Sequence, residues 1–379
     1  MQVTPVLAVV AVGLTLGIVD GTGAEASATA TCDGQVATIV GTPGDDVILA
    51  NQEVTGQVIV GLGGNDSILG SEQGDTICGG DGNDQIWAGA GSDWLAGGPG
   101  DDRLLAGIDL DVVAYGAATN GVNVDLTTGT ASGEGSDVID GAEVLVGSEL
   151  GDTLTGGADT IYLGGHGGDD RIQGGPASEL LEGGPGNDVV DGRGGADTVT
   201  GDVGNDALFG GPGLNQLQGG AGNDSLLPGP EPFRVLGGAG VDTAYFTEFA
   251  AGLVVNLQTS TIGGFGFITE TENVLGTPFA DVLRGDAAAN RLTGGNGPDV
   301  IEGASGPDRL EGGGGADRIT GGDATSTNDA DHIDGGSEND ILAGGPDNDT
   351  FFGGNGTDSC DGGPGTDSSS TCETTTGIP

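Results

Sequence analysis

The sequence contains no lysine, and eight arginines are its only Lys or Arg residues. Against them stand 58 aspartates and glutamates, which give a formal net charge of −50. A nucleic-acid-binding surface needs a basic patch to neutralise phosphates, so nucleic acid is not an expected partner. Aromatic residues make up only 4% of the chain, too few for the core of an ordinary globular domain. The chain is therefore either a disordered acidic polymer or a fold that incorporates cations.

A nonapeptide repeat decides between these two possibilities. The string G-G-x-G-x-D recurs nine times, first at Gly79–Asp84 and last at Gly362–Asp367. A nine-residue frame runs through residues 61–114, 147–245, 276–320 and 335–370. Position eight of each unit was not used to set this frame, yet it is a large apolar residue everywhere except at Ala244, Cys360 and Ser369. A disordered polymer has no reason to keep an aliphatic residue at every ninth position, so the repeat predicts a stacked fold.

The residues of one unit predict its local structure. Glycines at positions one, two and four allow positive φ and close backbone approach, so the first six residues are expected to form a turn. The last three form a short strand whose central apolar side chain points inward. One such strand cannot bury its side chain alone. Stacked units give two parallel ladders around a thin aliphatic core, and one coil takes 18 residues if alternate units feed opposite ladders.

Stacking also brings the position-six aspartates of successive coils over one another. Asp66 is expected to lie over Asp84 and Asp102, and Asp188 over Asp206. Such columns of carboxylates repel unless a cation lies among them. Calcium accepts six to eight carboxylate and carbonyl oxygens, whereas magnesium demands tighter octahedral geometry. The phased array therefore predicts calcium as the bound ion.

The G-G-x-G-x-D-x-U-x array, in which U is a large apolar residue, resembles the RTX, or haemolysin-type, calcium-binding repeat over about residues 41–370. The resemblance implies an all-β, right-handed parallel β-roll that binds several calcium ions between its turns. Carried over by position, it implies these metal ligands: Asp66, Asp75, Asp84, Asp93, Asp102, Asp170, Asp188, Asp197, Asp206, Asp224, Asp299, Asp308, Asp317, Asp340, Asp349, Asp358 and Asp367. Asp169 is an alternative to Asp170, because the frame there is ambiguous by one residue.

Some units depart from this pattern. Position six is occupied by Ile161, Glu179, Asn215, Phe233 and Asn290 in five units, whose sites are expected to be empty or weak. Five extra residues within 321–334 predict a bulged loop near Ser326.

Two segments without the repeat, 115–146 and 246–275, resemble each other and divide the chain. Gly121–Leu126 matches Gly252–Leu257, and its alternating apolar residues predict edge strands that cap the thin core. The predicted organisation is a leader (1–30), an N-terminal cap with a degenerate repeat (31–60), repeat block 1 (61–114), insert 1 (115–146), block 2 (147–245), insert 2 (246–275), block 3 (276–370) and a tail (371–379).

The N-terminal segment and the cysteines indicate export. Val6–Val19 is an apolar run suited to a signal-peptide core, and Ala28–Ala30 resembles a cleavage site; an uncleaved anchor is the alternative. After removal of this leader no membrane anchor is expected. Four cysteines favour disulfides over a zinc site, and of three possible connectivities we favour Cys32–Cys78 with Cys360–Cys372, because each pair would hold one end of the array.

No catalytic motif accompanies the repeat. The sequence has neither H-E-x-x-H nor G-x-S-x-G, so we predict no catalytic residue and no enzymatic activity. The expected function is that of a secreted calcium-binding protein with a structural or interaction role outside the cell. An adhesin or polysaccharide-binding module, with an anionic polysaccharide or a cell surface as partner, is the alternative. A polysaccharide-modifying enzyme is the weakest of the three hypotheses.

Overall fold

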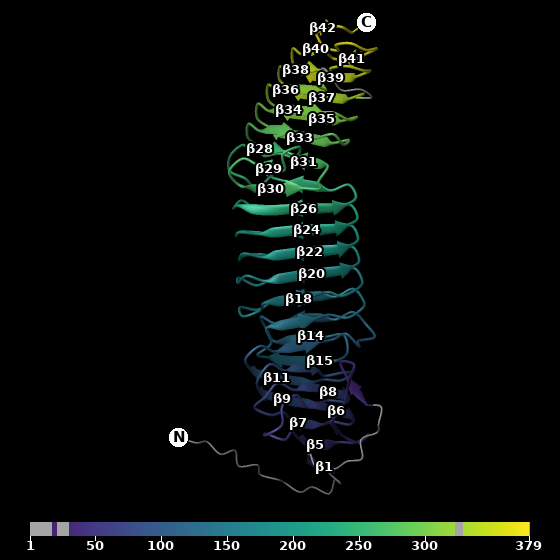
Figure 1. The fold of residues 1–379 in the computed structure, drawn as a ribbon, viewed down its shortest axis with the longest axis vertical. Helices are drawn as coiled ribbons and strands as arrows, with labels where there is room; N and C mark the ends of the chain where they lie inside the picture. The colour runs from purple at the N-terminus through teal and green to yellow at the C-terminus, as the bar shows by residue number, and fades with distance from the viewer. Residues whose placement is uncertain (1–16, 21–29, 323–328, 379) are drawn as a thin grey trace. The chain divides into compact units, whose positions relative to one another are not determined.

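The computed structural model describes residues 17–20, 30–322 and 329–378, and within these ranges every regular element is a β-strand. The chain forms two compact units. Unit 1 consists of residues 1–118 and 129–142, and unit 2 of residues 119–128 and 143–379. In each unit, short strands stack in parallel along two ladders and turns join one ladder to the other (Figure 1). The all-β parallel β-roll predicted from the repeat is confirmed.

Unit 1 has five principal strands in each ladder. The first ladder contains β5 (Asp46–Leu49), β7 (Ser67–Leu69), β9 (Gln85–Ala90), β11 (Arg103–Ile108) and β15 (Ser136–Asp140). The second contains β4 (Ile39–Val40), β6 (Val58–Gly63), β8 (Thr76–Asp81), β10 (Trp94–Ala96) and β12 (Val112–Ala114). Strand β1 (Gly17–Asp20) pairs in parallel with β5, β2 (Thr31–Cys32) pairs antiparallel with β3 (Gln35–Val36), and β14 (Thr130–Ser132) pairs antiparallel with β15.

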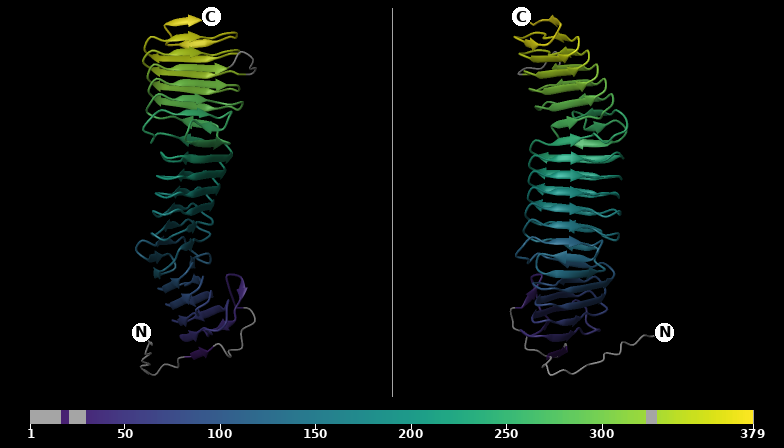
Figure 2. Two further views of the ribbon diagram at one scale, coloured as in Figure 1. Left: turned by 60° about the vertical axis from the view of Figure 1, so that its left-hand side comes forward. Right: turned by 180° about the vertical axis from the view of Figure 1, so that it is seen from behind.

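Unit 2 has the same two-ladder arrangement (Figure 2), with more strands in each ladder. Its first ladder contains β13 (Asn123–Asp125), β17 (Thr153–Thr155), β19 (Arg171–Gln173), β21 (Val189–Asp191), β23 (Ala207–Phe209), β25 (Ser225–Leu227), β27 (Thr243–Tyr245), β31 (Asn273–Leu275), β33 (Arg291–Asn296), β35 (Arg309–Gly314), β37 (His332–Ser337), β39 (Thr350–Asn355) and β41 (Ser368–Ser370). Its second ladder begins with β16 (Val144–Val146), β18 (Tyr162–Gly164), β20 (Leu180–Pro185), β22 (Thr198–Val203), β24 (Gln216–Ala221), β26 (Phe233–Ala239) and β30 (Gly266–Thr269). Within insert 2 it also includes β28 (Val254–Asn256), and after the insert it proceeds through β32 (Val282–Arg284), β34 (Val300–Ala304), β36 (Arg318–Gly322), β38 (Ile341–Ala343), β40 (Ser359–Asp361) and β42 (Thr374–Thr376).

The pairing register confirms the 18-residue coil. Leu208 pairs with Leu226, and Leu292 pairs with Leu310, so each position-eight side chain lies directly beside its equivalent one coil away. These side chains are almost entirely buried along both units. Ala244 and Cys360 are buried as well, whereas Ser369 is exposed. The core is therefore a narrow aliphatic column, and each coil depends on its neighbours for burial.

Glycine at position two is required by the turn. Gly220 has a φ of 114°, and a Cβ there would collide with the backbone carbonyl of Asp202 in the preceding coil. An L-residue rarely adopts this conformation, and close stacking leaves no space for a side chain. The glycine content is thus a direct consequence of coils packed at the spacing of a β-sheet.

Both inserts form strands, as predicted. In insert 2, β29 (Thr261–Ile262) pairs antiparallel with β28 and β30, while β27 pairs directly with β31. The insert therefore interrupts one ladder and leaves the other continuous. Phe233, Phe246, Phe249 and Phe265 pack together here, with ring centroids 5.5–5.8 Å apart, and Phe246 is fully buried. In insert 1, Val122 and Val124 are buried in unit 2.

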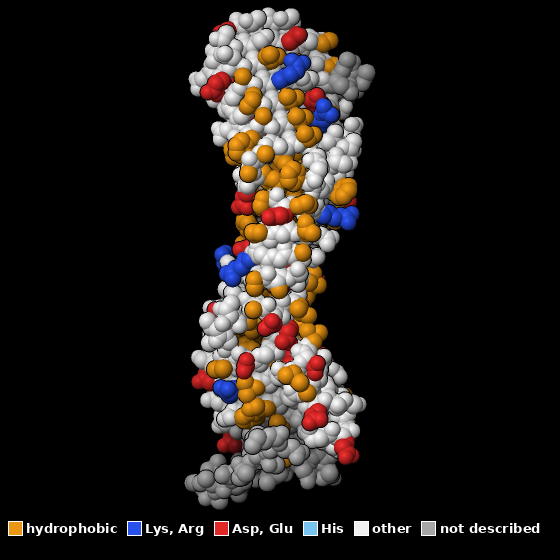
Figure 3. All heavy atoms as spheres, turned by 90° about the vertical axis from the view of Figure 1, so that its left-hand side faces the viewer, with side chains coloured by type: hydrophobic (Ala, Val, Ile, Leu, Met, Phe, Trp, Pro, Cys, Tyr) orange, Lys and Arg blue, Asp and Glu red, His pale blue; other side chains and the backbone are white. Residues whose placement is uncertain are grey.

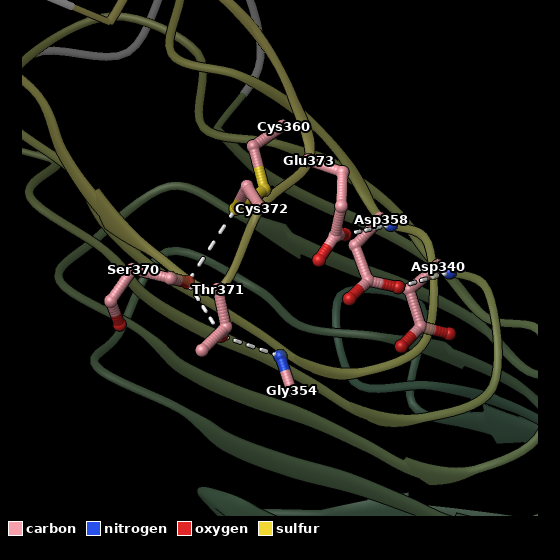
Figure 4. The surroundings of a disulfide bond; sticks show 8 residues. All are labelled: Asp340, Gly354, Asp358, Cys360, Ser370, Thr371, Cys372 and Glu373. Atoms are coloured by element: carbon pink, nitrogen blue, oxygen red, sulfur yellow. Dashed lines mark hydrogen bonds between the residues drawn. A yellow bond between two sulfur atoms is a disulfide. The ribbon is translucent and has the colours of Figure 1, made fainter.

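Both favoured disulfides are present. Cys32–Cys78 lies in unit 1, where Cys32 is packed with Val40, Val58 and Val60. Cys360–Cys372 lies in unit 2 and links β40 to the segment before β42 (Figure 4). The predicted leader falls outside the described residues except for β1 and Ala30, and the loop predicted near Ser326 also lies outside them. Over the residues described, no helix is long and apolar enough to cross a membrane.

Candidate calcium sites

Every one of the seventeen predicted carboxylates is buried beneath a turn. Their exposed fractions do not exceed 4%. The one-residue ambiguity in the frame is also resolved, because Asp170 is buried whereas Asp169 is exposed. Acidic side chains are almost never this buried in proteins unless something compensates their charge.

The aspartates stack in columns, as the repeat predicted. The backbone N–H of Asp188 donates to Oδ1 of Asp206 over 2.8 Å, and the N–H of Asp206 donates to Oδ1 of Asp224 over the same distance. The same bond joins Asp317 to Asp340. It also joins Asp340 to Asp358, as Figure 4 shows. One oxygen of each carboxylate is therefore used to hold successive coils in register.

The second carboxylate oxygen, Oδ2, lacks a hydrogen-bond donor in nearly all of these aspartates. Within the part of the chain that the structure describes, Oδ2 is buried and accepts no hydrogen bond from an N–H or hydroxyl group in sixteen of the seventeen predicted residues. The exception is Asp75, whose Oδ2 accepts a 2.7 Å bond from the N–H of Ser71. An unpaired buried oxygen is costly, and its repetition along a column points to a missing positive partner.

Backbone carbonyls face the same space. A Cβ placed on Gly335 would collide with Oδ2 of Asp340 and lie 2.7 Å from the carbonyl oxygen of Gly353, one coil further on. Glycine at position one thus leaves a space bordered by a carboxylate oxygen and a carbonyl oxygen. Two acceptors facing one another are repulsive unless a cation lies between them.

The donor set fits calcium. Across the described residues, no three His, Cys, Asp or Glu side chains gather into a cluster able to hold a metal. Any ion in these turns is therefore held by a mixture of carboxylate and carbonyl oxygens, which is the ligand chemistry of calcium rather than zinc.

Asn215 occupies position six in place of aspartate, and its hydrogen bonds show which group the carbonyls of the turn accept from there. Its Oδ1 keeps the column bond, accepting from the N–H of Asp197 over 3.0 Å. Its Nδ2 donates to the carbonyls of Gly211 (2.8 Å) and Pro228 (3.3 Å). An amide N–H therefore bonds the carbonyls that face a bare carboxylate oxygen elsewhere in the array, which supports a positive partner at the aspartate positions.

Burial raises the pKa of many column aspartates, and at several of them neighbouring carboxylates add to the effect. The pKa of Asp340 rises to about 6, that of Asp299 to about 7 and that of Asp331 to about 8. Glu179 also lies in a column, and burial together with Asp197 raises its pKa to about 7. Without a cation, these sites favour the protonated form.

The structure adds position-six residues that the sequence analysis did not include. Asp46, Asp111, Asp152, Asp242, Asp281 and Asp331 are all buried within the columns. Asp111, Asp152, Asp242 and Asp281 occupy position six of the nine-residue frame, and Asp331 begins D-x-U-x-G-G after the extra residues, so these five carried a readable signal. Asp137 in insert 1 had none. It accepts the column bond from Asp102 and a 2.9 Å bond from the Tyr115 hydroxyl.

Comparison with protein families supports this interpretation. The model of the RTX calcium-binding nonapeptide repeat matches in ten overlapping segments that together cover residues 56–113, 155–229 and 275–368. All seventeen predicted carboxylates lie within these ranges, and nearly all of both inserts lies outside them. Comparison with curated proteins gives no match.

We expect the metal-free chain to respond to pH in a defined direction. The folded pKa values of about 6–8 lie above the ordinary aspartate value near 4, so protonation stabilises the metal-free roll. This stabilisation is complete below about pH 4 and is lost as the pH rises through 6–8. In chelator, far-UV circular dichroism should show more β signal at pH 4.5 than at pH 8. Calcium affinity should fall between pH 8 and 5.5, because protons compete for the same oxygens. Spectra and affinities independent of pH would contradict the buried-carboxylate assignment.

Asn215→Asp should create a site. It replaces the amide N–H with an oxygen facing the carbonyls of Gly211 and Pro228, so we expect additional bound calcium, counted by equilibrium dialysis and atomic absorption. The matched control is Asn187→Asp, which makes the same charge change on an exposed turn residue and should leave the ion count unaltered. Equal ion counts in the two variants would argue against the site geometry.

Proposed function

The chain belongs to the RTX calcium-binding nonapeptide repeat family, and we propose that it is an exported protein whose β-roll folds when calcium fills its turns. Its role outside the cell is structural or interactive rather than catalytic. The observation that carries the proposal is the column of buried Oδ2 atoms, which accept no hydrogen bond from an N–H or hydroxyl donor in the described ranges and most of which lie beside a backbone carbonyl oxygen. The sites are formed by sixteen of the seventeen aspartates of the sequence prediction, and Asp75 is set apart because its Oδ2 already accepts a hydrogen bond from the N–H of Ser71.

Charge explains why calcium would drive folding. The chain carries a net charge of −50, and folding brings its aspartates into columns. Without a counter-ion, mutual repulsion and the loss of hydration oppose this arrangement. Calcium removes both costs at once, because it coordinates the carboxylate and the carbonyls that face it. Metal binding and folding are then the same event.

Two further features support an extracellular location. Disulfides Cys32–Cys78 and Cys360–Cys372 are typical of proteins that mature in oxidising compartments. Millimolar extracellular calcium would also fill sites with the affinity typical of extracellular modules, about 0.1–1 mM. The apolar run in residues 6–19 is the proposed export signal.

The test is a titration of residues 31–379 followed by far-UV circular dichroism. We expect a mostly unfolded chain in chelator at pH 8 and a cooperative gain of β signal with a midpoint at about 0.1–1 mM calcium. Magnesium at the same concentrations should produce a much smaller change, because it gives up water reluctantly. A full β spectrum in chelator at pH 8 would show that the roll does not depend on calcium.

Polysaccharide binding is a second candidate, favoured by one surface pocket in unit 2. This pocket of about 340 Å³ lies on the outward side of β27, β31, β33 and β35, and its lining includes Tyr245, Asn273, Leu275, Arg291 and Thr293. The Tyr245 ring can stack against a sugar. Arg291 forms a 3.6 Å ion pair with Glu311, which also lines the pocket, and can exchange this partner for a sugar carboxylate. Figure 3 shows how few basic side chains accompany the acidic and apolar ones on one face of this protein.

If an acidic glycan binds in this pocket, Tyr245→Ala and Arg291→Ala should each weaken the binding of polygalacturonate about tenfold at saturating calcium. Binding would be measured by affinity electrophoresis. Arg318→Ala, on the opposite ladder, is the control of equal charge change. No binding by the unmodified protein, or equal loss in all three variants, would count against the pocket.

A further inference from the structure

The first turn of each aspartate column differs from the turns that follow. Where a column begins within the described residues, the side-chain oxygen or amide that points into the turn forms a hydrogen bond with another group of the chain. Four of these turns contain Ser or Thr at position two in place of glycine: Thr42 with Asp46, Ser71 with Asp75, Ser148 with Asp152, and Thr277 with Asp281.

Asp152 shows the arrangement in detail. Its Oδ2 accepts a 2.6 Å bond from the N–H of Ser148, and its Oδ1 accepts a 2.8 Å bond from the Ser148 hydroxyl. The same hydroxyl accepts from the N–H of Leu150 over 3.1 Å. Both oxygens of this buried carboxylate are thus neutralised by donors from its own turn.

Thr277 repeats this pattern in a different block. Its N–H donates to Oδ2 of Asp281 over 2.6 Å, its hydroxyl donates to Oδ1 over 3.0 Å, and the N–H of Phe279 donates to that hydroxyl over 3.0 Å. Neither Ser148 nor Thr277 takes the positive φ seen at position two in Gly220. These turns therefore have a distinct backbone conformation that directs an N–H at the carboxylate.

The remaining two columns begin with a residue other than aspartate, and its side chain also forms a hydrogen bond within the chain. Asn290 precedes Asp308, and its Nδ2 donates to the carbonyl of Glu272 over 3.1 Å. In the coil before Glu179, the repeat frame placed Ile161 at position six, but Ile161 is exposed and Thr160 is buried instead. The Thr160 hydroxyl accepts from the N–H of Gly157 over 2.8 Å. Each supplies its own hydrogen-bond partner where later turns present a bare carboxylate.

The reason lies in what precedes each column. Asp152 and Asp281 receive their interstrand bonds from the N–H groups of Val122 and Leu253, which belong to the inserts and not to glycine-rich turns. A calcium ion needs six to eight oxygens, and an ion at the start of a column would lack those of the preceding turn. A turn closed by its own donors avoids an incompletely coordinated ion.

We infer that these first turns are calcium-independent caps, and that each run of calcium-binding turns begins on a turn closed by the chain's own N–H and hydroxyl groups. This inference rests on the proposed calcium-binding function and specifies which turns of the array do not bind calcium. The signature is G-[S/T] at positions one and two with aspartate at position six. Asp75, which the repeat frame included among the ligands, is on this basis a cap.

The test compares Asp281→Asn with Asp299→Asn in the full chain. These residues are neighbours in one column, joined by the 2.7 Å bond from the N–H of Asp281 to Oδ1 of Asp299. At saturating calcium, Asp299→Asn should lower the number of bound ions by at least one. Asp281→Asn should leave the ion count unaltered and lower the thermal midpoint, because an asparagine cannot accept at both of its terminal atoms. Ions would be counted by atomic absorption after dialysis.

A milder variant keeps the test decisive if Asp281→Asn fails to fold. Thr277→Ala removes the hydroxyl but keeps the N–H donor, so it should also lower the thermal midpoint without changing the ion count. Equal ion loss in Thr277→Ala and Asp299→Asn would overturn the capping inference. An unmodified protein that binds no calcium would instead overturn the proposed function itself, so the two failures can be told apart.

Discussion

One constraint underlies most of this structure: a carboxylate oxygen is buried opposite backbone carbonyl oxygens, coil after coil. Asp340 and the carbonyl of Gly353 show it in its simplest form, bordering a space that a Cβ on Gly335 would fill. Two acceptors in such a place need a positive partner, whether a calcium ion, a proton or an N–H group. The glycines, the acidic composition and the 18-residue coil all follow from repeating this arrangement.

The chain uses each kind of partner in a different place. Asn215 places an amide against the carbonyls, Tyr115 donates its hydroxyl to Asp137, and Ser148 donates its N–H and hydroxyl to Asp152. At the far end of one column, Glu373 takes the final bond from the N–H of Asp358, beside the Cys360–Cys372 disulfide (Figure 4). Under the proposed function, the interior of each column binds the ion, while first turns such as those of Asp152 and Asp281 are closed by the chain's own hydrogen bonds.

This arrangement divides stability between two sources. The aliphatic column, with residues such as Leu226 and Leu310 fully buried, supplies hydrophobic stabilisation that does not depend on calcium. It is thin, because each coil adds only two such side chains. The carboxylate columns oppose folding until they are neutralised. Under the proposed function, the folded state is favoured where calcium is abundant.

The sequence by itself determined the fold class, the coil length, the inward side chains and the stacking of aspartates such as Asp188 over Asp206. These follow from a strict nine-residue period, and a period constrains every coil in the same way. It also indicated both disulfides, because each pair lies at one end of the array. It did not distinguish Asp75 from Asp93, since both occupy position six of the frame. Only the tertiary structure separated them, because the difference depends on which donor reaches Oδ2 and on what the preceding coil supplies. Tyr115 and Asp137 likewise became partners only through folding, since their contact joins residues outside the repeat, where no period carries the information.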